Sequence, residues 1–189
     1  METLTCVCLG IGLSAACGFR VFVPLLFMSL AALSGHLTLA HSFAWIGTYP
    51  ALITFAVATG LEIGGYYIPW VDHLLDTLAT PAAVVAGTIV TAAIITDVSP
   101  LLKWTLAVIA GGGVAGVVQG STVLARATST ATTGGLGNPL FATIELGGAV
   151  VTSFMALVAP IVLALLVMVT LWLVVKKLVH RKLRPVPVK

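Results

Sequence analysis

Three ionisable residues, Arg20, Glu62 and Glu145, lie deep inside long apolar stretches of the sequence. Burial of such a group in lipid costs roughly 2.5–3.5 kcal/mol on insertion scales, so each should face a partner or water. Each glutamate is followed, one residue later, by a Gly-Gly pair that permits close backbone approach. We interpret Glu62 and Glu145 as proton or cation acceptors that meet in a cavity, and Arg20 as the contact for an anion. The alternative is a structural pair between Arg20 and a glutamate, with no substrate.

A second candidate site is the polar stretch 126–138, which contains Arg126, Thr132, Thr133 and Asn138. Hydroxyl groups and flexible glycines before a helix N-terminus favour binding of a phosphate, a lipid headgroup or a carboxylate. The Gly-Lys-Ser/Thr ending of a nucleotide-binding loop is missing. A plain flexible loop and a re-entrant loop that lines a cavity remain alternatives.

The connector 69–80 holds the third candidate, Asp72 and Asp76, which are four residues apart with His73 beside them. Two carboxylates and an imidazole make a weak candidate set for a divalent metal, and we favour a charged interfacial turn. No nucleophile–base pair and no zinc set is evident in the sequence. We therefore expect no enzymatic activity and no cofactor.

The segments that must position these residues are apolar and long. Of the 189 residues, 59% are hydrophobic and 8% are charged, whereas a soluble domain has roughly a quarter of its residues charged. About 20 residues span the hydrocarbon core as a helix, so we predict an all-α transmembrane bundle of about six helices in a single domain, residues 1–178. The predicted segments are 4–33, 48–68, 81–96, 101–124, 139–157 and 160–178. The first is long for one crossing, and is either a kinked helix or two half-helices that meet near Gly18.

The Glu-x-Gly-Gly pattern recurs in the middle segment of each half of the chain, at Glu62 and at Glu145. With three crossings in each half, residues 1–97 and 98–178 would form an inverted-topology repeat, as in many transporters. Chance recurrence in a sequence rich in glycine and alanine is the alternative.

Residues 176–189 contain six of the nine Lys and Arg residues. By the positive-inside rule we predict that residues 179–189 form a basic cytoplasmic tail. Six crossings would then place the N-terminus in the cytoplasm as well. We expect an inner-membrane, multi-pass protein that binds no nucleic acid.

The chain also carries Gly-Phe-Arg-Val-Phe-Val-Pro-Leu at 18–25, Tyr-Tyr-Ile-Pro-Trp-Val-Asp at 66–72, Thr-Pro-Ala-Ala at 80–83 and Thr-Gly-Gly-Leu-Gly-Asn-Pro at 133–139. These motifs resemble the domain-of-unknown-function 4126 family of bacterial integral membrane proteins. The resemblance covers about residues 5–175. It implies a polytopic inner-membrane protein and no established activity.

Together these features favour a small transporter or channel for a small polar or anionic solute. Coupling of transport to a proton or a cation is one form of this function. Substitutions of Arg20, Glu62 and Glu145 would test it. A carrier of a lipid-linked phosphate, using Arg20, Arg126 and the Thr-rich stretch, is one alternative. A non-transporting scaffold or assembly factor is another. The expected partners are membrane lipids, the solute or lipid headgroup, and a second copy of the chain in a homodimer.

Overall fold

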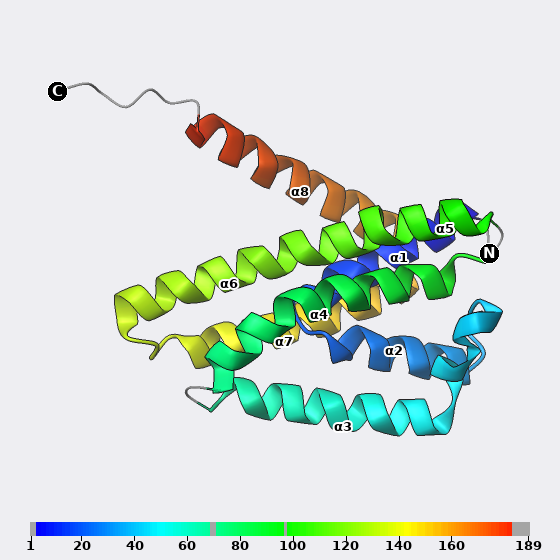
Figure 1. Ribbon diagram of the computed structural model, residues 1–189, viewed down its shortest axis with the longest axis horizontal. Coiled ribbons are helices and arrows are strands. Elements are labelled where there is room, and N and C mark those ends of the chain that lie inside the picture. The colour runs from blue at the N-terminus through cyan, green and yellow to red at the C-terminus, as the bar shows by residue number, and fades with distance from the viewer. Residues whose placement is uncertain (1–2, 69–70, 97, 183–189) are drawn as a thin grey trace.

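The computed structural model describes residues 3–68, 71–96 and 98–182. In this part of the chain the regular elements are helices, and the longer ones run roughly along the long axis of the molecule (Figure 1). Their bounds are α1 Thr3–Cys17, α2 Phe22–Leu33, η1 His41–Gly47, α3 Tyr49–Tyr66, α4 Val71–Ile94, α5 Pro100–Leu106, η2 Ala107–Gly112, α6 Gly113–Thr133, α7 Asn138–Val158 and α8 Pro160–Lys182. The predicted all-α bundle is confirmed.

The first predicted segment is a hairpin of two half-helices, α1 and α2 (Figure 1). Residues 18–21 turn the chain inside the bundle. The outer ends of both helices lie at the same end of the molecule, near the end of α4. Gly10 of α1 lies against Thr91, and the amide of Ala40, which follows α2, donates to the Ala93 carbonyl at 2.8 Å. The segment therefore enters and leaves the bundle on one side.

The prediction that a helix starts at Pro81 is wrong, because α4 begins ten residues earlier and Pro81 lies inside it. An interior proline typically costs a helix about 3 kcal/mol. Here the added turns bring Asp72 and Asp76 to polar partners on α7 and α6. The position of a proline in the sequence does not by itself reveal these contacts.

The prediction of a loop at 126–138 is also wrong, since α6 continues to Thr133. Hydroxyl groups along its last turns donate to carbonyls of the same helix, as Thr132 does to Thr128 at 2.9 Å. Each such bond satisfies a polar group that would otherwise oppose the helix. The turn is confined to residues 134–137, where Gly134 and Gly135 have φ values of 65° and 90°.

Three helical stretches are long and apolar enough to cross a membrane, and the bent pair η1–α3 makes a fourth. The three are Leu74–Ile94, Pro100–Thr133 and Asn138–Val158. Exposed apolar side chains cover α8, including Val162, Leu165 and Leu166. A surface of this kind belongs in lipid, so the chain is a membrane protein.

The halves 1–97 and 98–178 are built differently over the described residues. The first opens with a hairpin, whereas the second opens with α5, a π-helical turn and α6 in one continuous stretch. The inverted repeat therefore stays a prediction. Of the proposed basic tail, residues 179–182 continue α8, and residues 183–189 lie outside the described part of the chain.

The turn of the hairpin packs tightly against α6, which gives a test of its position. A Cβ on Gly18 would lie 2.5 Å from the Val118 Cβ and 2.7 Å from the Ala115 carbonyl oxygen. We expect Gly18→Ala to lower the free energy of unfolding in detergent micelles by about 1–3 kcal/mol, because backbone atoms must shift. Gly60→Ala is the matched control, since no heavy atom lies within 4 Å of its added Cβ. Equal losses in both variants would contradict the packing.

Candidate functional site

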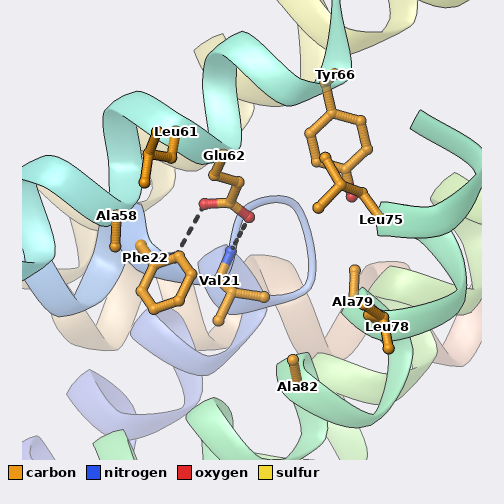
Figure 2. Close-up of a pocket in the computed structure, with 10 residues that line it drawn as sticks. All are labelled: Val21, Phe22, Ala58, Leu61, Glu62, Tyr66, Leu75, Leu78, Ala79 and Ala82. Carbon is orange, nitrogen blue, oxygen red and sulfur yellow. Dashed lines mark hydrogen bonds between the residues drawn. The ribbon is translucent and has the colours of Figure 1, made fainter. Parts of the chain in front are cut away.

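The site is centred on the first turn of α2, which begins inside the bundle. The amide N–H groups at the start of a helix have no partner within the helix. Glu62 of α3 supplies one: its Oε1 accepts from the Val21 amide at 2.8 Å and its Oε2 from the Phe22 amide at 3.1 Å (Figure 2). The side chain is 7% exposed. A carboxylate here also faces the positive end of the helix dipole, so the contact is charge-assisted.

Arg20 lies in the same turn and is 1% exposed. Its Nη2 donates to the Ala142 carbonyl of α7 at 2.8 Å and lies 3.6 Å from Oε2 of Glu145. Its guanidinium carbon is 3.7 Å from the ring centroid of Tyr66. Within the described structure, its Nε and Nη1 have no hydrogen-bond partner.

Arg126 of α6 forms a second, stronger pair with Glu145 of α7. Its Nε donates to Oε1 at 3.0 Å, and its Nη2 contacts Oε2, so the pair is bidentate. Its Nη1 lies 3.3 Å from Oδ1 of Asp76 on α4. The guanidinium carbon also lies 4.1 Å from the ring centroid of Tyr66. One aromatic ring therefore contacts both buried arginines.

We call Arg20, Glu62, Tyr66, Asp76, Arg126 and Glu145 the buried charge cluster. It joins the hairpin turn to α3, α4, α6 and α7. When its carboxylates and guanidiniums are all ionised and Tyr66 is neutral, three negative charges face two positive ones. One proton or one monovalent cation would balance this excess.

Cavities lined by described residues reach the cluster at three places. One of about 360 Å³ has Glu62 and Tyr66 in its wall (Figure 2). A second, of about 490 Å³, lies between α4 and α6 and is lined by Asp76 and Arg126. The third, of about 300 Å³, reaches Glu145. The buried charges are therefore close to spaces that a solute or water can enter.

The other predicted substrate-binding residues, Asn138, Thr132 and Thr133, lie outside the cluster. Asn138 is buried, and its Nδ2 donates to Oδ2 of Asp72 at 3.0 Å, which joins the start of α7 to the start of α4. Thr132 and Thr133 are exposed and donate to carbonyls of their own helix, at Thr128 and Ser129. The structure therefore separates the threonines from Arg126.

The weak metal candidates Asp72 and Asp76 have different neighbours, Asn138 and Arg126. The side chain of His73 lies outside what is described. Among the described residues, no three His, Cys, Asp or Glu side chains come together in a way that could hold a metal ion. A metal site at this place has no support from the geometry.

Two members of the cluster were not assigned to it from sequence. The sequence places Tyr66 only within the motif at 66–72, and it favours a charged interfacial turn for Asp76. The four-residue spacing of Asp72 and Asp76, one face of a helix, was a usable signal for α4. No pattern in the sequence indicates that the Tyr66 ring would contact two arginines.

The apolar helices, the hairpin turn and the cluster occupy one continuous region of the chain. The family described as "Domain of unknown function (DUF4126)" matches residues 7–180. The chain belongs to this family. No curated protein and no solved structure matches the chain. The family resemblance inferred from the motifs is confirmed.

The bidentate pair gives a prediction about stability. In Glu145→Ala, Arg126 and Arg20 lose a shared carboxylate and remain buried, which typically costs about 3–5 kcal/mol when one partner is removed. We expect this variant to unfold at a much lower temperature or to fail to accumulate in membranes. Replacement of both partners, Glu145→Gln with Arg126→Gln, should recover much of the loss, as measured by thermal unfolding in detergent. If the double variant is no better than the single one, the pairing is not the source of the stability.

Proposed function

We propose that the protein is a small membrane transporter or channel whose path passes the hairpin turn. The observation that carries the proposal is Glu62, a buried carboxylate that caps a helix in the bundle interior and also lines a cavity. Helix termini inside the membrane, next to a cavity, are a common way for transporters to hold ions and solutes.

Proton or cation coupling is supported by the charge balance of the cluster. Glu145 and Asp76 each contact a guanidinium, whereas the bonds of Glu62 go to backbone amides. Protonation of Glu62 would remove one acceptor from the α2 terminus and loosen the turn. A proton could therefore bias the hairpin between two positions, as alternating access requires.

A polar or anionic solute is supported by the two arginines. Nε and Nη1 of Arg20 are buried donors without a partner in the described structure, and Arg126 lines the largest of the three cavities. A carrier of a lipid-linked phosphate has less support, because Thr132 and Thr133 bond to their own helix.

A non-transporting scaffold is the second candidate function. It is favoured by the number of ion pairs that join α4, α6, α7 and the turn. A scaffold needs the helix cap that Glu62 supplies but not the cavity beside it, and the cavity therefore separates the two candidates. The predicted homodimer stays a prediction.

We expect proteoliposomes with an imposed pH gradient to lose the gradient faster than protein-free vesicles when a suitable solute is outside. Potassium, glycine and inorganic phosphate serve as cationic, zwitterionic and anionic probes, and an internal pH dye gives the rate. Glu62→Gln should return the rate to background, because the amide still accepts a backbone N–H but cannot exchange a proton.

Lys103→Gln is the control for this assay. It also removes a charge, but Lys103 lies in α5 against Phe43, away from the cluster, and the rate should match that of the wild type. If the folded wild-type protein never exceeds protein-free vesicles with any of the three probes, the transport proposal fails and the scaffold is favoured.

The orientation that we propose differs from the sequence-based one, which counted six crossings. The hairpin adds none, and we infer that α8, whose described apolar part spans Pro160–Leu173, crosses together with α3, α4, α5–α6 and α7. An odd number puts the two termini on opposite sides of a bacterial inner membrane. Because the basic residues follow α8, we place the C-terminus in the cytoplasm and the N-terminus outside.

Reporter fusions at each terminus test this orientation. A reporter that is active only in the cytoplasm should give signal at the C-terminus, and one that is active only outside should give signal at the N-terminus. Cytoplasmic signal from both termini would instead support six crossings.

A further inference from the structure

The cavity beside Glu62 combines one buried carboxylate with walls that are otherwise almost wholly apolar. α2, α3 and α4 contribute Phe22, Leu61, Leu75 and Leu78 to it. Figure 2 shows these side chains around the carboxylate, with Phe22 next to it. Leu61 and Leu78 are 72% and 57% exposed, so the mouth of the cavity lies at the lipid-facing surface between α3 and α4.

Among the described residues that line this cavity, Glu62 is the one that carries a charge. Arg20 is 3.6 Å from Glu145, and Arg126 contacts both Glu145 and Asp76. Neither arginine is among the described residues that line the cavity, whereas Glu62 is. Both arginines are nevertheless close enough to Glu62 to interact with it electrostatically, and so is Cys17 of α1. Tyr66 of α3 also lines the cavity and contacts both guanidiniums. A ligand in the cavity therefore meets one carboxylate and no cation in its wall.

The chemistry of the wall limits what can bind. A hydrated inorganic cation needs several oxygen ligands, and a ligand rich in hydrogen-bonding groups would leave them unsatisfied against apolar side chains. An anion would be repelled by Glu62. A quaternary or otherwise delocalised cation has no hydrogen bonds to lose, gains apolar contacts, and can lie against the Phe22 ring.

We propose that this cavity binds a lipophilic organic cation, which enters from the bilayer and competes with a proton for Glu62. The cavity volume of about 360 Å³ lies within the range of roughly 300–1,000 Å³ typical of sites for small organic ligands. This ligand differs from the polar or anionic solute proposed for the arginines, because it binds beside Glu62 in a separate cavity. The inference rests on the proposed transport function only for movement across the membrane.

The test is equilibrium binding of radiolabelled tetraphenylphosphonium to the purified, full-length protein in detergent. Tetraphenylborate has nearly the same size and shape with the opposite charge, and is the matched ligand control. We expect saturable binding of the phosphonium, and at least about tenfold weaker binding of the borate. The affinity for the phosphonium should fall as the pH is lowered, because a proton then occupies Glu62.

Three variants assign the binding to this cavity. Glu62→Gln should weaken phosphonium binding about tenfold or more and abolish its pH dependence. Ala58→Leu fills the cavity from α3 and should block binding while the carboxylate stays in place. Ala56→Leu makes the same change on the exposed side of the same helix, outside the cavity, and should bind as the wild type does. Circular dichroism and size-exclusion profiles show whether each variant is folded.

The outcomes separate this inference from the proposed function. Equal binding of phosphonium and borate, or binding that folded Glu62→Gln keeps in full, would overturn the cation site in favour of a cavity for lipid chains. An absence of phosphonium binding, together with gradient loss that depends on Glu62, would overturn the inference and leave the transport proposal standing. Specific binding without gradient loss would support the site and count against transport.

Discussion

The rest of the structure depends on the contact between the Glu62 carboxylate and the two backbone amides at the start of α2. A helix that begins inside a membrane bundle has N–H groups that neither lipid nor its own turns can satisfy. One carboxylate on α3 accepts from two of these groups and places a negative charge at the positive end of the helix dipole. Without this contact the hairpin would lack its buried turn, and Arg20 would not be held beside α7.

A buried carboxylate brings a charge that the surrounding helices must balance. The cluster does this through Arg20 and Arg126, with Glu145 between them, Asp76 at one side and the Tyr66 ring against both guanidiniums. Because each contact joins different helices, the ion pairs that balance the buried charges also hold the helices together. The excess of one carboxylate, beside a cavity, is the feature that packing alone does not require.

Close contacts between neighbouring helices allow the hairpin to fit inside the bundle. Ser14 of α1 donates to the Gly87 carbonyl of α4 at 2.9 Å, and an added Cβ on Gly111 would lie 2.5 Å from the same carbonyl oxygen. Small residues let backbones approach this closely in lipid, where dispersion and hydrogen bonds hold helices together. The turn at Gly18 can therefore lie against α6, at the depth where Glu62 reaches it.

The sequence is sufficient to predict the helical membrane bundle, because long apolar runs admit few other structures in lipid. It also singled out Arg20, Glu62 and Glu145, since the desolvation cost makes a charge inside an apolar run informative. Tertiary structure decided that residues 126–133 are helical, that α4 passes through Pro81, and that Tyr66 and Asp76 join the cluster. The extension of α4 and the cluster depend on partners far away in the chain, whereas the hydroxyl groups at 126–133 bond within their own helix. The sequence around a residue does not indicate how strongly that residue is stabilised by a polar contact with another helix.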